Sequence, residues 1–369
     1  MSSDQEFSPL LESLRGVAAL SVASFHALPF SGSADIYATW DRIYLIGSNG
    51  RDAVFAFFVI SGLVLTKSLT RNIQTNPAWM TRYYVHRVFR LFPAAVFVIC
   101  LILAASYAGL PSNGSHSPVN AILNMLMIRT DINPVMWSMK VELIAAGFIP
   151  FIVLGAVTYG PRLLFGLFLL LFGVSWSGEF NGIASGTNLA GLYAFVLGMM
   201  IHFPQTDLTR KIPVRWRTVA AVLAVAVYCY CNTRSATGWT QLAVCLSSAV
   251  LIGLLNHFPN MEAFKPLSFR IVRFYGKISY SFYLLHITIL AAMAHMFPYV
   301  EWTSAPGVPM PVKVAFQVAA LIAMTTLPAY LVWRYVEMPG IRAGRFVFER
   351  LSRRTRNAGS ASTQATLYS

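Results

Sequence analysis

The sequence is poor in charged residues. Asp, Glu, Lys and Arg make up 11% of the 369 residues, whereas 56% are hydrophobic. A soluble domain carries about 25% charged residues, so the composition excludes an ordinary soluble protein and indicates a chain that lies mostly in a membrane. The 14 acidic residues are outnumbered by 28 lysines and arginines, which gives the chain a net charge of +14. Because the basic residues lie between apolar runs, this excess favours an effect of membrane topology over nucleic-acid binding.

Cysteine is scarce as well. The four cysteines lie in apolar runs, and none has the spacing of a metal site. We therefore expect no metal, and we expect the cysteines to be small buried apolar residues. A cleavable signal peptide is not expected either, because the apolar run from Leu14 leads into polar sequence without a small-residue cleavage site.

Long apolar runs are abundant, and a membrane span needs about 20 residues. We expect an all-α polytopic membrane protein with about ten transmembrane helices. The runs at 162–177 and 188–203 are short for a span. The expected spans lie near 14–30, 53–70, 88–110, 135–158, 162–177, 188–203, 217–233, 239–257, 278–298 and 313–335.

Lysine and arginine gather in alternate loops between these runs. By the positive-inside rule, this pattern predicts that both termini are cytoplasmic. We expect one transmembrane domain over residues 1–345. The remaining residues, 346–369, are rich in Ser, Thr and Arg towards their end and are expected to form a partly disordered cytoplasmic tail.

Ionisable side chains inside spans are costly and usually face a cavity or a partner. His26 lies about 16 Å above Arg15 at about 1.5 Å per residue. Glu142 and Ser61 enter from the opposite side and reach a similar depth. A histidine and a carboxylate at one depth suit general-base catalysis, although a buried hydrogen bond that only fixes helix packing is the alternative. Glu142 and Asp52, which begins the second span, are both candidates for the carboxylate.

Arg87 and Arg90 lie three residues apart on one helical face at the cytoplasmic end of the third span. Paired arginines bind phosphate through forked hydrogen bonds, whereas ordinary anchoring at the membrane surface is the alternative. Trp137, Ser138 and His286 are candidates for binding the acceptor substrate. For Trp137 the alternative is an interfacial position, and for His286 it is a structural role.

Together these stretches resemble the membrane-bound acyltransferase 3 family, which includes bacterial O-acetyltransferases of surface polysaccharides. The resemblance covers about residues 8–345 and rests on the order of six pieces. They read "LRGVAALSVASFH", "GRDAVFAFFVISG", "RVFRLFP", "WSMKVE", "GKISYSFYLLH" and "EMP".

The resemblance implies a multi-pass inner-membrane enzyme that takes an acyl group, acetyl in the commonest case, from cytoplasmic acyl-CoA. The implied acceptor is a hydroxyl of an exported or lipid-linked polysaccharide. His26 matches the essential histidine, Arg15 its partner, and Arg87 and Arg90 the CoA end, to which we also assign Ser61. Direct attack by the acceptor and an acyl-histidine intermediate both stay open.

A proton-coupled transporter or glycan exporter is the alternative function, with His26 and Glu142 as a proton relay. The sequence shows no repeated halves and no matched pair of Gly- or Pro-broken spans, which argues against it. The partners that we expect are the glycan acceptor and membrane lipids, and not nucleic acid.

Overall fold

The structure is a computed structural model that describes residues 8–28, 44–110, 113–177, 191–234, 237–296 and 309–367, with the side chains of 177, 310 and 353–367 outside the description. Every regular element in these ranges is helical, so the expected all-α class is confirmed. The elements are α1 (Pro9–His26), α3 (Gly50–Thr75), α4 (Trp79–Tyr107), α5 (Pro118–Met125), η1 (Pro134–Met136), α6 (Trp137–Tyr159), α7 (Leu163–Ser177), α9 (Leu192–His202), η2 (Thr209–Lys211), α10 (Val214–Asn232), α11 (Gly238–His257), η3 (Glu262–Ser268), α12 (Arg270–Met296), α14 (Met310–Val332), η4 (Trp333–Glu337) and α15 (Met338–Leu367).

Each expected span overlaps one described helix, and residues 29–30, 188–190 and 297–298 of the expected spans lie outside the described residues. Seven helical segments are long and apolar enough to cross a membrane, and α7 and α9 are two shorter apolar helices. The remaining expected span corresponds to α1, which begins earlier than expected because Pro9 occupies its first turn, where no backbone N–H is needed. The protein is therefore a multi-pass membrane protein. The number of spans and the side that faces the cytoplasm stay predictions.

The outer surface of the bundle carries large apolar side chains. Leu169 on α7, Val222 on α10 and Leu327 on α14 are 65%, 59% and 64% exposed. Cys100 on α4 is exposed too, so the expectation that it is buried is wrong, because this side of α4 faces outwards. A soluble surface rarely exposes so much apolar area, whereas lipid would cover it without penalty.

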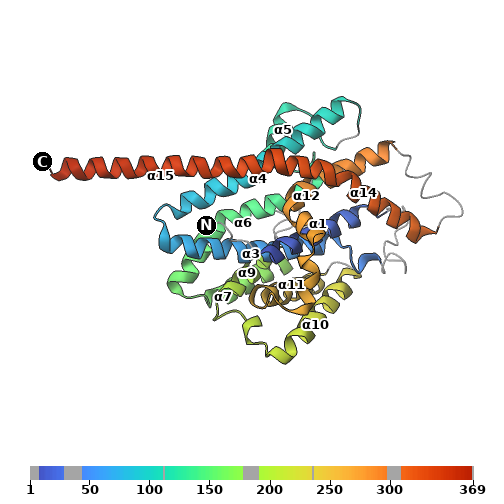
Figure 1. Ribbon diagram of the computed structural model, residues 1–369, viewed down its shortest axis with the longest axis horizontal. Helices are drawn as coiled ribbons and strands as arrows, with labels where there is room; N and C mark the ends of the chain where they lie inside the picture. The colour runs from blue at the N-terminus through green and yellow to red at the C-terminus, as the bar shows by residue number, and fades with distance from the viewer. Residues whose placement is uncertain are drawn as a thin grey trace.

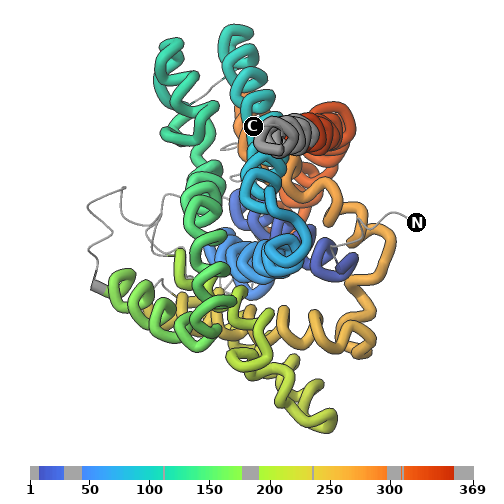
Figure 2. Tube along the Cα trace, turned by 90° about the vertical axis from the view of Figure 1, so that its left-hand side faces the viewer, coloured from blue at the N-terminus to red at the C-terminus, as the bar shows by residue number. Residues whose placement is uncertain are grey.

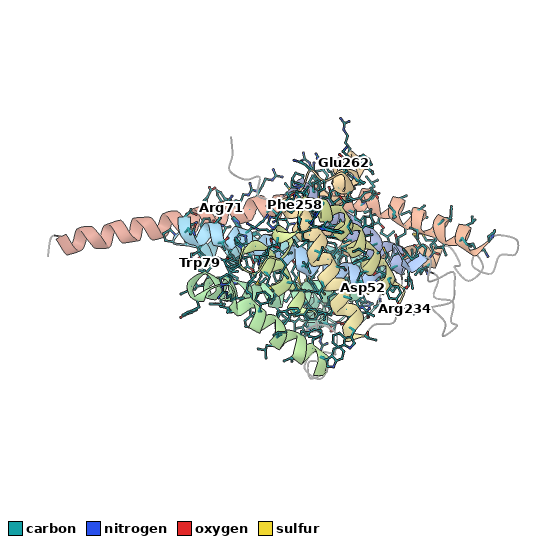
Figure 3. All side chains as sticks on the ribbon, turned by 90° about the horizontal axis from the view of Figure 1, so that it is seen from below. Asp52, Arg71, Trp79, Arg234, Phe258 and Glu262 are labelled. Atoms are coloured by element: carbon teal, nitrogen blue, oxygen red, sulfur yellow. The ribbon has the colours of Figure 1, made fainter. Side chains whose placement is uncertain are left out.

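The helices α1 and α3 form the centre of the bundle (Figure 2). In Figure 1 the helix α15 ends at the far left, well beyond the rest of the molecule. Figure 3 shows Asp52 and Arg71, which lie near the two ends of α3, at opposite ends of the bundle. The helix α3 thus runs from one end of the bundle to the other.

The final helix enters the stretch that is expected to form a partly disordered tail, and the disorder stays a prediction. α15 runs as helix from Met338 to Leu367, through residues for which partial disorder is expected from composition. No proline follows Pro339, and arginine, leucine and glutamate in this stretch are good helix formers. Local propensity is therefore enough to continue the helix that begins in the bundle.

The loop before α6 is held by an aspartate. Asp131 accepts hydrogen bonds from Asn120 Nδ2 (2.7 Å) and Asn124 Nδ2 (2.9 Å). Burial alone would raise the pKa of Asp131, but these hydrogen bonds outweigh it and lower the pKa. Asn133 Nδ2 then donates to the Leu284 carbonyl (3.0 Å), which ties the start of α6 to α12.

The helices α1 and α12 touch without intervening side chains. A Cβ on Gly16 would lie 2.5 Å from the Gly276 nitrogen, and a Cβ on Gly276 would lie 2.6 Å from the Glu12 carbonyl oxygen. Small residues let helix backbones approach in this way in membranes. His26 and His286 each lie ten residues beyond the contact glycine of their own helix. Ten residues rise about 15 Å at 1.5 Å per residue, so the contact brings both histidines to one level.

We predict that Gly16→Ala destabilises the protein by about 1–3 kcal/mol, because the added methyl group forces the two backbones apart. Gly147→Ala on α6 is the matched control, since nothing lies within 4 Å of its added Cβ. Thermal melting in detergent measures both. Equal melting temperatures for the two variants would show that the glycine contact does not set the spacing of α1 and α12.

Candidate active site

A histidine pair joins α1 to α12. His26 Nδ1 and His286 Nε2 lie 3.0 Å apart, and the two rings are stacked with centroids 5.1 Å apart. His286 is fully buried. Its Nδ1 lies 2.6 Å from the backbone carbonyl oxygen of Tyr283.

These contacts fix the tautomers of both neutral rings. A carbonyl oxygen only accepts, so His286 Nδ1 carries a hydrogen and donates it to Tyr283. His286 Nε2 is then an acceptor, and His26 Nδ1 must donate to it. The lone pair of His26 is thereby left on Nε2, which is the state that a general base or a nucleophile requires.

A large cavity opens at the end of the bundle that contains the start of α1. Its volume is about 810 Å³, and six of its lining side chains are basic whereas one is acidic. The walls come from α1, α3, α4, α6, α9 and α15. The basic residues are Arg15, Lys67, Arg71, Arg87, Arg90 and Arg345. Such a cavity suits a polyanion.

A buried ion pair closes the inner end of this cavity. Arg87 Nη2 binds Glu142 Oε1, and the two side chains are only 10% and 8% exposed. Ser61 Oγ donates to the same carboxylate oxygen (3.1 Å). Three helices, α3, α4 and α6, thus meet at Glu142. Glu142 and Ser61 reach one level as expected from their depth, but the protein partner of this carboxylate is an arginine and not His26.

Positive charge exceeds negative charge around the ion pair. Arg15 lies in the electrostatic field of Arg90, Glu142, Arg87 and Glu337. Glu337 is buried because the π-helical turn η4 carries it into the bundle, where Ser281 Oγ donates to its Oε2 (2.8 Å). The arginines Arg15, Arg87 and Arg90 thus outnumber the carboxylates of Glu142 and Glu337. The inner wall therefore keeps a net positive charge, which would attract an anionic or polarised group.

A second, much smaller cavity follows the first. It has a volume of about 20 Å³ and shares Arg15, Ser61 and Glu142 with the large cavity. Its far wall includes Ser138 and Tyr283, and the Tyr283 ring centroid lies 5.6 Å from that of His286. Because a single water needs at least about 10–15 Å³, this space holds one water at most. The small cavity therefore lies between the basic cavity and Tyr283, the neighbour of His286.

The remaining expected site residues divide into two groups. Ser138 lines the small cavity and donates to the Tyr283 hydroxyl (2.8 Å), so it lies on the path to the histidines. Trp137 packs against Phe58, with ring centroids 6.3 Å apart, and lines neither cavity. Asp52 lines neither cavity and so lies outside this path.

Asp52 is paired within its own helix end. It forms an ion pair with Arg51 (3.2 Å), and its backbone N–H is capped by Asn49 Oδ1 (3.2 Å). Its other electrostatic neighbours include Tyr193 and Cys245, on α9 and α11. The structure therefore brings neither Asp52 nor Glu142 into hydrogen-bond contact with His26 among the described residues.

A sequence model of an acyltransferase domain, that of the acyltransferase 3 family, matches residues 9–334. The chain belongs to the acyltransferase 3 family. Relatives include two proteins of Staphylococcus aureus, from strains MSSA476 and MRSA252, each named "Putative O-acetyltransferase". Each is 24% identical over 379 residues, which cover 92% of this chain and 58% of the relative. The chain thus spans little more than half the length of these relatives. No solved structure matches the chain.

Several residues that line the basic cavity were not predicted from the sequence. Lys67 and Arg71 are an example, because basic residues near a helix end are usually interpreted as membrane anchors. A signal was present, since Ser61, Ser68 and Arg71 recur at seven and three residues and so share one face of α3. A polar face on an otherwise apolar span indicates a cavity.

We predict strong coupling between Arg87 and Glu142. Removing one partner, as in Arg87→Gln or Glu142→Gln, leaves an uncompensated buried charge and costs about 3–5 kcal/mol of stability. The double variant leaves no charge, so it should lose much less than the sum of the two single losses. A double-mutant cycle on thermal stability measures the coupling, and additive losses would rule out the buried ion pair.

Proposed function

We propose that the protein is an acyl-CoA-dependent O-acyltransferase of the inner membrane that acylates, most simply acetylates, a hydroxyl of an exported or lipid-linked cell-surface polysaccharide. One observation carries this proposal: the basic cavity adjoins a small cavity lined by Tyr283, the Tyr283 ring lies 5.6 Å from that of His286, and the hydrogen bond between the two histidines leaves the lone pair of His26 on Nε2. Family membership supports acyl transfer. The names of the relatives support oxygen as the acceptor atom.

The basic cavity would hold the phosphates of CoA. A polyanion cannot leave the aqueous side cheaply, so it stays where Arg90, Arg71 and Lys67 line the wall. The uncharged pantetheine arm is slim and can extend past Ser61 and Arg15 towards the histidines. Arg15 and His26 are eleven residues apart on α1, which is a rise of about 16 Å that the arm would follow.

The reaction then needs one base and one leaving group. His26 Nε2 takes the proton of the acceptor hydroxyl while its oxygen attacks the thioester carbonyl carbon. The C–S bond breaks, and the CoA thiolate takes the proton back from His26. His286 stabilises the transient imidazolium by accepting from its Nδ1, while its own Nδ1–H donates to the Tyr283 carbonyl. The same lone pair could instead attack the thioester and form an acyl-histidine. This intermediate would accumulate when acyl-CoA is supplied without acceptor.

The acceptor would approach from the opposite side of the membrane. His26 ends α1 at the end of the bundle remote from the basic cavity, so donor and acceptor need not enter by the same opening. With the start of α1 in the cytoplasm, as the distribution of Lys and Arg favours, the donor is cytoplasmic and the glycan is extracytoplasmic.

We predict that His26→Ala lowers acetyl transfer from acetyl-CoA by about 10²–10⁴-fold, because the general base is lost. Release of free CoA by membranes that contain the protein measures the rate, and mass spectrometry of the surface glycan measures the product. His295→Ala, an exposed histidine at the end of α12, is the control and should retain the parent rate.

Full acetylation by the folded His26→Ala variant would overturn the assignment of the base. Failure of the parent protein to consume any acyl-CoA would overturn the donor, and it would favour the alternative of an exporter.

We further predict that His286 acts as a positioning residue. His286→Phe keeps the ring volume but removes the acceptor for His26 Nδ1, so kcat should fall at least about tenfold, with KM for acetyl-CoA unchanged. His286→Gln restores an acceptor oxygen and should recover part of the loss. Equal kcat values for the Phe and Gln variants, at equal thermal stability, would show that the hydrogen bond does not orient His26.

A further inference from the structure

A side recess opens from the basic cavity between α3 and α4. It has a volume of about 120 Å³, roughly four times the ~30 Å³ that a water molecule occupies in the liquid. It shares a wall with the large cavity, formed by Leu65, Ser68, His86, Arg87 and Arg90. The residues that line the recess alone are Leu69, Asn72, Trp79, Arg82 and Tyr83.

The recess combines flat aromatic side chains with one amide. Trp79 is half-buried at the start of α4, and Leu69 is almost fully buried. The Tyr83 hydroxyl donates to the Ala146 carbonyl (3.1 Å), so the ring and not the hydroxyl is available to a ligand. Aromatic rings of this kind stack on nucleic-acid bases, whatever their sequence.

Asn72 supplies hydrogen bonds of both kinds. Its Nδ2 donates to the Ser68 carbonyl (2.6 Å), which orients the amide and leaves one N–H. Its Oδ1 bonds no protein donor in the part of the chain that the structure describes. A carboxamide with one donor and one acceptor free matches the N6 and N7 edge of adenine, as it does where asparagine reads this base.

Cations lie where the phosphates of a nucleotide would follow its base. Arg90 stands in the wall shared with the large cavity, and Arg82 lines the recess itself. A lipid chain would use neither Asn72 nor Arg82, and a lone phosphate would not use the Trp79 ring. Figure 3 shows Trp79 at the same end of the bundle as Arg71, which lines the large cavity, and remote from Asp52.

From these contacts we infer that the recess binds the purine base of the nucleotide part of the acyl donor, with Trp79 stacked on the base and Asn72 on its edge. The inference rests on the proposed function, since it gives the donor of that function a defined orientation. The base lies between α3 and α4, the phosphates lie across Arg90, and the pantetheine arm points towards Ser61.

Donor analogues test the base site. Trp79→Leu keeps an apolar side chain but removes the ring, so KM for acetyl-CoA should rise roughly 5- to 150-fold, as expected when a base loses one aromatic stack. KM for S-acetylpantetheine, which lacks the nucleotide, should be the same in variant and parent. Trp79→Phe keeps a ring and should lie close to the parent. Trp216→Leu, an exposed tryptophan near the start of α10, is the matched control.

Acetyl-dephospho-CoA, which lacks the 3′-phosphate, separates base from phosphate. The fold-rise caused by Trp79→Leu should be the same with this donor as with acetyl-CoA. If the rise disappears without the 3′-phosphate, the recess binds phosphate and the inference is overturned. An unchanged KM for acetyl-CoA in Trp79→Leu would also overturn it, while acetyl transfer by the parent would leave the proposed function intact.

Discussion

The contact between Gly16 and Gly276 is the constraint on which the candidate site depends. It brings the backbones of α1 and α12 so close that a methyl group would not fit between them. Because both helices start from the same side, the ten residues beyond each glycine carry His26 and His286 to the same height. A histidine pair with defined tautomers is therefore a product of helix spacing, and not of any local motif.

Buried charge is the second organising feature. Arginine and glutamate are costly inside a span, yet Arg87 and Glu142 are both nearly inaccessible. Their pairing across α4 and α6 offsets this cost and holds Ser61 of α3 in place. The carboxylate that depth alone places near the histidine is thus engaged in organising the cavity floor, and the histidine receives its support from a second histidine.

The positions of most helices could be predicted from the sequence, whereas the contacts between them could not. Apolar runs located the helices of all ten expected spans because the lipid environment demands them, but they located neither α5 nor α15. The pairing of Arg87 with Glu142 could not be predicted, since two long side chains meet only after three helices have packed. The histidine pair had a readable signal, the equal spacing of Gly16 to His26 and Gly276 to His286, but its meaning requires knowing that α1 and α12 are neighbours.

The small size of the second cavity has a consequence for the membrane itself. Any route that admits a thioester across the bilayer could also admit protons, and it would then dissipate the ion gradient. With room for one water and walls that include Phe57, Phe58 and Tyr283, the passage cannot hold a continuous file of water molecules. In this conformation the bundle is therefore closed to a file of water molecules at this point, so the proposed passage of the donor's arm requires these rings to move.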